Sequence, residues 1–516
     1  MAHYFIYFFL ALILALIFTI FTGRLARRWG ILDMPGGGRK IHARPTPLLG
    51  GLAIYLSFFL ILSFAGRYLL AGNLHISHWL GFALGGLIIM IGGFLDDKYD
   101  LRPWQQFIFP ILAAVCIVFS GVEIARITNP FGGFIVLPAL VSALIIIFWL
   151  LGLMYTTKLL DGVDGLVSGV TFIGALIIFL FTLTTHYYQP DIALAAAVLM
   201  GSVLGFLIFN WHPAKIFLGE GGSLFCGFAL GVLAIISGGK IAVTLLVMGI
   251  PILDVAWTII RRLGQGKNPF RFSDSKHLHH RLLALGLGQR GTVLVFYALA
   301  LSFGLAGLFL QSRGKLLALG LLLLLMFLIV VLFSVWEKKK PKLLLQVCCA
   351  PCSAYTASQI LAAKYQVTLY YYNPNIDNEA EYLKRLAAVK FVAEKYHLPL
   401  LIESYNHPAW LKKVQGQEQA PEHGVRCATC LRARIKKTAL VAKDGHYDLF
   451  GTSLTASPFK DSAQILGYGR ELAKEIGVKF LDLDFKDNDG WHKSLTLAKD
   501  LDIYRQKYCG CEFAKR

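Results

Sequence analysis

The chain is organised around the stretch Gly92-Gly93-Phe94-Leu95-Asp96-Asp97, where an apolar run ends at two adjacent carboxylates. A charged carboxylate at the centre of a bilayer costs about 2.5–3.5 kcal/mol on insertion scales, so it is retained where it reaches water or binds a cation. A divalent metal bound to a phosphate would suit both acids. The stretch therefore predicts a membrane segment that ends at a polar site.

The composition places this segment in a membrane protein with a second, different part. The 516 residues are 56% hydrophobic and carry a formal net charge of +19, which excludes an ordinary soluble globular protein. The apolar character belongs to residues 1–336. We expect a membrane domain there, a short basic linker at 337–341 and a second domain at 342–516.

Eleven apolar runs are long enough to cross a bilayer, which takes about 20 residues per helix. The first run lacks the features of a removed signal peptide, so we expect a retained helix. The eleven runs lie near 4–22, 48–71, 79–95, 105–121, 138–155, 166–186, 192–210, 222–237, 241–259, 291–310 and 315–335.

The basic residues predict the orientation of these helices. The loops that follow odd-numbered helices, together with the tail after the last one, hold most of the Lys and Arg of the first part. The positive-inside rule then puts the N-terminus outside the cell and everything after Trp336 in the cytoplasm. We expect a multi-pass plasma-membrane protein whose polar motifs face the cytoplasm.

Those odd-numbered loops carry the unusual motifs of the first part. Carboxylates there could hold Mg²⁺ or Mn²⁺, basic residues could offset phosphate charge, and histidines could serve as acids or bases. Taken singly, each motif also fits a solvated cap, a turn or a helix end. The motifs are Arg39-Lys40-Ile41-His42, Leu160-Asp161-Gly162-Val163-Asp164-Gly165, Pro213-Ala214-Lys215-Ile216-Phe217-Leu218-Gly219-Glu220-Gly221-Gly222-Ser223 and His277-Leu278-His279-His280-Arg281.

With these motifs in this order, segment 39–290 resembles the polyprenyl-phosphate N-acetylhexosamine-1-phosphate transferases. The eleven runs and the spacing His277-x-His279-His280 favour the branch that uses a UDP-N-acetylhexosamine donor. The acceptor implied by the resemblance is undecaprenyl phosphate.

The resemblance also implies roles for individual residues. Catalytic roles fall to Asp96, Asp97, Asp161, Asp164, His277, His279 and His280. Magnesium or manganese would be held by Asp97, Asp161 and Glu220. Substrate contacts would come from Lys40, His42, Lys158, Lys215 and Arg281.

Three residues depart from the family pattern. Lys158 stands where the family usually has Asn, Glu220 where it usually has Asp, and Gln106 near a position that is usually Lys. Glu keeps the charge on a longer arm, whereas Lys158 adds a cation that could hold a phosphate or displace the metal. Two hypotheses stay open at this point: an active transferase, and an inert membrane anchor that tethers the second domain.

The second part begins with alternating strand and helix patterns. Lys342–Val347 predicts a buried strand, Ala357–Lys364 a helix and Val367–Tyr372 a second strand. This alternation predicts an α/β domain with a parallel sheet.

Seven of the nine cysteines lie in this second part, in three tight groups. Disulfides are rare in the cytoplasm, so the clustering indicates thiolate ligands to iron or zinc. A structural zinc site in a nucleotide-binding module is the alternative. The cysteines are Cys348, Cys349, Cys352, Cys427, Cys430, Cys509 and Cys511.

These groups, with Tyr372-Asn373-Pro374-Asn375-Ile376 and Ser457-Pro458-Phe459-Lys460, make residues 342–513 resemble the cobalamin-independent iron-sulfur epoxyqueuosine reductases. The resemblance implies a Rossmann-like domain that binds a four-iron four-sulfur cluster, with an additional iron as an option. The substrate would be tRNA carrying epoxyqueuosine, and the electron donor is unknown. Some basic residues could meet tRNA phosphates or could equally form a solvated face: Lys384, Arg385, Arg432, Arg434, Lys436 and Lys437.

The fold expected from the sequence is therefore a polytopic α-helical membrane domain of about eleven transmembrane helices, fused to a cytoplasmic α/β Rossmann-like iron-sulfur domain. The function expected is that of a bifunctional fusion of a sugar-1-phosphate transferase with an epoxyqueuosine reductase.

Overall fold

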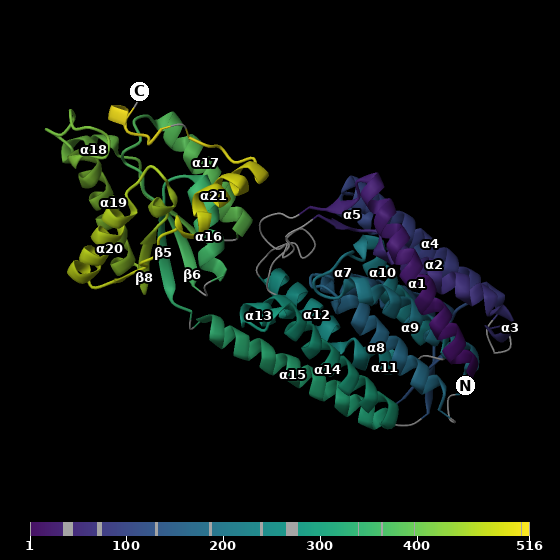
Figure 1. Ribbon diagram of the computed structural model, residues 1–516. Helices are drawn as coiled ribbons and strands as arrows, with labels where there is room; N and C mark the ends of the chain where they lie inside the picture. Colours follow the sequence, from purple (N-terminus) through teal and green to yellow (C-terminus); the bar gives the residue numbers. More distant parts are fainter. Residues whose placement is uncertain are drawn as a thin grey trace. The chain divides into compact units, whose positions relative to one another are not determined.

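The protein, seen in a computed structural model, folds as two compact units (Figure 1). The first ends at Phe333 and the second begins at Ser334. The structure describes residues 2–34, 45–69, 75–129, 133–184, 188–237, 241–264, 277–338, 340–362, 365–396, 398–506 and 508–514.

The first unit is built of helices with two short antiparallel ladders. Leu32–Asp33 (β1) pairs with Thr46–Pro47 (β2), and Arg126–Thr128 (β3) pairs with Phe134–Val136 (β4). The helices are α1 (Ala2–Trp29), α2 (Gly50–Phe64), α3 (Gly66–Leu69), α4 (Ile76–Tyr99), α5 (Pro103–Gln106), α6 (Ile108–Phe119), α7 (Ala139–Leu160), α8 (Leu166–Thr182), α9 (Pro190–Asn210), α10 (Gly219–Ile236), α11 (Ile241–Val247), α12 (Gly249–Gly264), α13 (Leu278–Ala284), α14 (Gly288–Phe309) and α15 (Ser312–Lys338).

Seven of the helices in the described ranges are long and apolar enough to cross a membrane: α1, α4, α7, α9, α10, α14 and α15. The pair α11 and α12, bent by 77°, makes an eighth if it is one span. The remaining three expected runs fall on shorter apolar helices, Gly50–Phe64, Pro103–Phe119 and Leu166–Thr182. In the described residues, length and composition thus support seven spans, or eight with the bent pair, fewer than the eleven expected.

Helix α10 lies at the centre of this unit. Of its apolar window, 89% is buried, against 22% for α1, and it packs against α2, α4, α7 and α8. Leucines on the outer helix α15, such as Leu317 and Leu332, are exposed instead. Exposed apolar rows on the outside and small residues at the internal contacts are what a helix bundle in lipid requires.

Glycines let the N-terminal end of α10 lie directly on α2 and α4. A Cβ atom added at Gly51 would come within 2.1 Å of the Gly222 Cα, and one added at Gly93 within 2.1 Å of the Gly221 nitrogen. Only backbones without side chains fit at such separations. Because Glu220 begins the same turn of α10, this packing brings it to the end of α4, where Asp96 and Asp97 lie.

The described residues of the second unit form an α/β domain with a five-stranded sheet in which every neighbouring pair is parallel. This confirms the predicted α/β class and parallel sheet. The strand order is β7-β6-β5-β8-β9. The strands are β5 (Lys342–Val347), β6 (Gln366–Tyr371), β7 (Leu400–Ile402), β8 (Leu449–Thr452) and β9 (Lys479–Phe480).

Helices cover both faces of this sheet (Figure 1). Leu343 and Leu345 of β5 pack into the core beneath α16, α17 and α21, while Leu344 packs into the core beneath α19 and α20. Burial on both faces explains why Lys342–Val347 is a nearly continuous apolar run. The helices are α16 (Ala350–Ala362), α17 (Glu379–Tyr396), α18 (His407–Lys413), α19 (Val425–Asp444), α20 (Ser462–Ile476) and α21 (Gly490–Asp500).

The helix predicted over 357–364 begins earlier than expected. It starts at Ala350, so Pro351 and Cys352 lie in its first turn. Proline suits this position, because its missing N–H has no partner in the first turn of a helix. The cysteine group 348–352 thus joins the end of a strand to the start of a helix.

Candidate functional sites

Asp96 and Asp97 lie at the C-terminal end of α4 and bind different partners. Asp96 is 9% exposed, and its Oδ1 accepts hydrogen bonds from the Leu101 nitrogen at 2.9 Å and from Gln106 Nε2 at 3.1 Å. Both carboxylate oxygens of Asp97 accept from the Glu220 nitrogen at 3.2 Å. A carboxylate at the N-terminus of α10 is favoured by the helix dipole.

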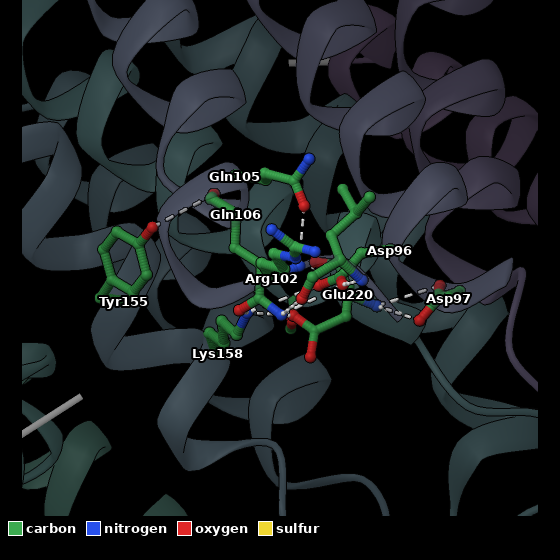
Figure 2. A network of polar contacts seen from close by, with 10 residues as sticks. Asp96, Asp97, Arg102, Gln105, Gln106, Tyr155, Lys158 and Glu220 are labelled. Carbon is green, nitrogen blue, oxygen red and sulfur yellow. Dashed lines mark hydrogen bonds and ion pairs between the residues drawn. The ribbon is translucent and has the colours of Figure 1, made fainter. Parts of the chain in front are cut away.

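Lys158, near the end of α7, enters this acidic site as a cation (Figure 2). Its Nζ lies 2.8 Å from Glu220 Oε2 and 3.8 Å from Asp96 Oδ2. The same ammonium donates to Gln106 Oε1 at 3.0 Å. The three residues that depart from the family pattern, Gln106, Lys158 and Glu220, therefore belong to one hydrogen-bonded network, which we call the Lys158 network.

The carboxylates of this site are hard oxygen donors, the type that Mg²⁺ and Mn²⁺ prefer. Among the described residues, however, no three His, Cys, Asp or Glu side chains are placed as a metal site. Glu220 is paired with Lys158. The donor chemistry fits a divalent cation, but such an ion would have to compete with the ammonium for Glu220.

The turn that carries Asp161 and Asp164 meets the predicted histidine cluster. A Cβ atom added at Gly162 would lie 2.7 Å from His279 Nε2, so only glycine leaves room for that ring. His279 is 1% exposed and stacks on His277, with ring centroids 5.6 Å apart. Burial, with the neighbouring His280 and His277, lowers the pKa of His279 well below its usual value. The imidazole is therefore neutral at physiological pH.

Two acid–histidine pairs accompany these motifs, one buried and one part-buried. His277 Nδ1 lies 2.9 Å from Asp254 Oδ2, and Asp254 Oδ1 accepts from the Leu278 nitrogen at 2.9 Å. His212 Nδ1 lies 2.7 Å from Asp164 Oδ2. Such pairs fix the orientation of an imidazole ring.

Sequence reasoning missed the roles of His212 and Asn210. Asn210 Oδ1 accepts from the Gly165 nitrogen at 3.1 Å, and its Nδ2 donates to the Ile216 carbonyl at 3.0 Å. Asn210 thus ties the turn after α7 to the loop before α10. The two polar residues Asn210 and His212, at the end of an apolar run, were the available signal.

The other predicted residues of the first unit are more dispersed. Asp161 and Lys215 are exposed, and the Arg281 guanidinium lies over the Phe333 ring at 5.5 Å. The His280 ring lies 4.3 Å from that of His279, between centroids. Lys40 and His42 lie outside the described residues.

In the second unit, four of the seven cysteines line one cavity: Cys427, Cys430, Cys509 and Cys511. They come from α19 and from the C-terminal segment, about 80 residues apart in sequence. Burial raises the pKa of the Cys430 thiol and raises that of Cys511 to about 11. Both thiols are therefore protonated at neutral pH until a metal binds.

The other three cysteines lie at the carboxyl end of β5. Cys348 Sγ is 3.7 Å from Cys349 Sγ, and Cys352 follows in the first turn of α16. Asn373, just after β6, donates to the Val347 carbonyl at 3.1 Å and so joins this edge of the sheet. Ligands of open parallel sheets bind at the carboxyl ends of the strands.

Two basic residues expected to meet tRNA phosphates are internal instead. Arg385 donates to Glu381 Oε1 at 2.7 Å and to the carbonyls of Tyr508 and Cys509. Arg434 donates to Asn373 Oδ1 at 2.5 Å. Both are 3% exposed, so a surface role for them is wrong. The exposed residues Arg432 and Lys436 are paired with Glu471 and Glu475, and the half-buried Lys437 is paired with Glu403.

Comparison with known proteins separates the same two parts. Residues 79–238 match the family described as Glycosyl transferase family 4. The chain is 32% identical over 317 residues to a probable undecaprenyl-phosphate N-acetylglucosaminyl 1-phosphate transferase of Bacillus subtilis, covering 59% of this chain and 84% of that protein. It is also 32% identical over 322 residues to a decaprenyl-phosphate N-acetylglucosaminephosphotransferase of Mycolicibacterium smegmatis, covering 56% and 78%.

The second part has its own relatives. Residues 343–516 match the family described as Epoxyqueuosine reductase QueH. The chain is 36% identical over 190 residues to the epoxyqueuosine reductase QueH of Streptococcus pyogenes, covering 35% of this chain and 74% of that protein. With two enzyme families matched by two separate parts, the chain belongs to the family 4 glycosyl transferases through its first unit and to the QueH epoxyqueuosine reductases through its second.

Proposed function

We propose that the first unit transfers an N-acetylhexosamine 1-phosphate from a UDP-sugar to undecaprenyl phosphate at the cytoplasmic face of the plasma membrane. The observation that carries the proposal is the meeting of Asp97 and Glu220 at the contact of α4 with α10, held there by glycine-to-glycine packing. A phosphate oxygen of the acceptor lipid would attack the β-phosphorus of the donor, and UMP would leave.

The membrane arrangement proposed with this reaction has eleven spans, the N-terminus outside and residues 342–516 in the cytoplasm. Residues 1–336 form the membrane domain and 337–341 the linker. The three shorter apolar helices and the bent pair α11–α12, added to the seven long helices, support this count. The concentration of basic residues in alternate loops supports the orientation.

Individual roles are proposed from the family resemblance, and for some side chains their contacts give further support. Asp97, Asp161 and Glu220 would hold Mg²⁺ or Mn²⁺, which when bound would offset the negative charge of the reacting phosphates. His277, held by Asp254, and His279, neutral and buried, would contact the donor phosphates as hydrogen-bonding groups. Asp96 and Asp164 would shape the site through their hydrogen bonds with Gln106 and His212. The residues proposed to bind substrate are Lys40, His42, Lys158, Lys215 and Arg281.

Release of UMP tests this function. The detergent-purified full chain is incubated with undecaprenyl phosphate, Mg²⁺ and UDP-N-acetylglucosamine, with Asp97→Asn as the inactive variant. Lys98→Met changes the next residue, which is exposed, and serves as the matched control with normal turnover. Absence of turnover with every UDP-N-acetylhexosamine would contradict the proposal.

We propose that the second unit reduces epoxyqueuosine in tRNA to queuosine. Two electrons and two protons remove the epoxide oxygen as water. The strand order β7-β6-β5-β8-β9 supports a Rossmann-like assignment, because it reverses at β5, where Cys348 and Cys349 follow. The four cysteines of the cavity are suited to a four-iron four-sulfur cluster, and the other three to an additional iron.

The reductase is tested with epoxyqueuosine-containing tRNA, the anaerobically purified full chain and a chemical reductant. Queuosine is measured by mass spectrometry of the digested tRNA, and iron and sulfide are determined on the same sample. Zinc without sulfide in that sample would favour the alternative of a zinc-stabilised module.

One observation favours a second candidate for the first unit, an inert anchor that holds the reductase at the membrane. The Lys158–Glu220 pair occupies the carboxylate that a divalent cation would need. The UMP assay separates the two candidates, because an anchor releases no UMP while tRNA reduction proceeds.

A further inference from the structure

The cavity lined by the four cysteines is strongly cationic. Arg426, Arg434 and Lys460 line it together with Cys427, Cys430, Cys509 and Cys511, and none of the described lining residues carries a carboxylate. Both arginines are 3% exposed. Buried charges are retained where they are paired or hydrogen-bonded, and three cations around one cavity suit a negatively charged partner.

Hydrogen bonds to described groups of the protein satisfy these cations only in part. Arg426 Nη1 donates to the carbonyls of Glu418 and Ala420 at 2.6 and 2.7 Å, and Arg434 Nη2 donates to Asn373. The Nε atoms of both arginines are buried without a hydrogen-bond partner in the described structure. Among the described residues, the two arginines are thus held in place by neutral groups, and no carboxylate forms an ion pair with them.

Lys460 differs from the arginines because it contacts a thiol directly. Its Nζ lies 3.1 Å from Cys509 Sγ. An ammonium stabilises a sulfur atom more strongly as the charge on that sulfur becomes more negative. A metal-bound thiolate next to Lys460 would therefore be stabilised most in the reduced, more negative state of the centre.

We infer that Lys460, acting through the Cys509 sulfur, raises the reduction potential of an iron-sulfur centre in this cavity, with Arg426 and Arg434 supplying further positive charge. The inference rests on the proposed cluster of the second unit. Net charge and hydrogen bonds to sulfur are recognised determinants of such potentials. Lys460 is thus a positioning and tuning residue. It makes it more favourable for the centre to accept an electron, which the substrate later receives.

A redox titration of the anaerobic full chain, followed by electron paramagnetic resonance of the reduced centre, tests this. Lys460→Met removes the charge, Lys460→Gln retains a donor without charge, and Lys460→Arg retains both. Lys436→Met is the matched control, because Lys436 lies on the surface of the same unit, paired with Glu475. Iron and sulfide contents are measured for each variant.

For Lys460→Met we expect the ratio of reduced to oxidised centre at a fixed potential to fall about tenfold, which is about 59 mV for one electron. Lys460→Gln should shift in the same direction, while Lys460→Arg and Lys436→Met should stay near the unchanged protein. Full iron with an unchanged potential in Lys460→Met overturns the inference. Loss of the centre from both uncharged variants also overturns it, because Lys460 would then retain the metal without setting its potential.

Turnover of tRNA is measured separately on the same samples. A shifted potential without any queuosine formation in the unchanged protein leaves the inference standing and removes the reductase function. Normal queuosine formation in the unchanged protein, together with an unshifted potential in Lys460→Met, removes the inference and leaves the reductase function standing.

Discussion

At the scale of single residues, the Lys158 network decides how the first unit meets a divalent cation. The ammonium shares its charge between Glu220 and Asp96 and hydrogen-bonds Gln106. Lys158→Met should free Glu220 to bind the metal. Half-maximal UMP release should then need about tenfold less Mg²⁺, which corresponds to about 1.4 kcal/mol of relieved competition. The measurement is a Mg²⁺ titration of the initial rate.

Lys98→Met is the control for this titration, because Lys98 is exposed at the end of α4 and should keep the original Mg²⁺ requirement. If Lys158 instead holds the donor phosphate, its loss raises KM for the UDP-sugar and leaves the Mg²⁺ requirement unchanged. That result would contradict the competition with metal.

The buried His279 ring should make the free energy of unfolding depend on pH. The folded chain excludes a proton from this buried ring, since its pKa is lowered, whereas the unfolded chain binds one at about pH 6.5. The unfolded state therefore binds more protons, so stability falls as pH drops below about 6.5, by at most about 1.4 kcal/mol per pH unit. His279→Phe should flatten this dependence in thermal unfolding scans in detergent.

The control for these scans is His75→Phe, at an exposed histidine that precedes α4. It should show the slope of the unchanged protein. An equal slope in His279→Phe would show that another group carries the dependence.

At the scale of elements, the contact between α4 and α10 sets the geometry of the acids. Gly93→Ala places a methyl group 2.1 Å from the Gly221 backbone nitrogen, so the helices must separate. Overpacking of this kind costs about 1–3 kcal/mol. We expect a lower unfolding temperature together with loss of UMP release, because Glu220 would move away from Asp97.

Gly152→Ala, on α7, is the matched substitution, because a Cβ atom added at Gly152 has no described atom within 4 Å. It should leave both the unfolding temperature and the rate close to those of the unchanged protein. Gly93→Ala behaving like Gly152→Ala would mean that the α4–α10 contact adjusts without moving the site.

Sequence patterns predicted elements better than they predicted contacts. Lys342–Val347 was found as β5 because a strand buried on both faces is apolar at nearly every position. The helix expected over 357–364 begins earlier, at Ala350, and Pro351, which suits a first helical turn, was the available signal for that start. The eleven runs all fall on helices, but several of these helices are shorter than a bilayer needs.

The site could be located from sequence but not assembled. Alternate basic loops and the aspartates placed the chemistry at the helix ends. The pairing of Lys158 with Glu220 could not be foreseen, because it depends on glycine packing between helices far apart in the chain. The burial of Arg385 and Arg434 was equally hidden, since charged residues near motifs look the same whether they face solvent or a cavity.

At the scale of the whole molecule, two compact units predict two separable unfolding events. Chelation of iron should lower the unfolding temperature of the second unit only. Its thiols, with the pKa of Cys511 raised to about 11, must release protons to bind metal, so bound metal stabilises the folded state. Each kcal/mol lost corresponds to about 2–4 °C for a domain of about 150–250 residues.

Scanning calorimetry with and without chelator, with iron determined on each sample, provides the measurement. The transition that persists unchanged is assigned to the first unit by its response to detergent. A chelator that shifts both transitions equally would mean that the units do not unfold independently.

The Lys158 network also has an evolutionary consequence. The Lys158 ammonium contacts Glu220 and Gln106, which lie on two other helices, so replacing any one of these three residues removes a contact from at least one of the other two. Substitutions at such positions are non-additive. Few mutational routes can therefore lead away from this arrangement one residue at a time, and related chains should exchange these three positions as a set.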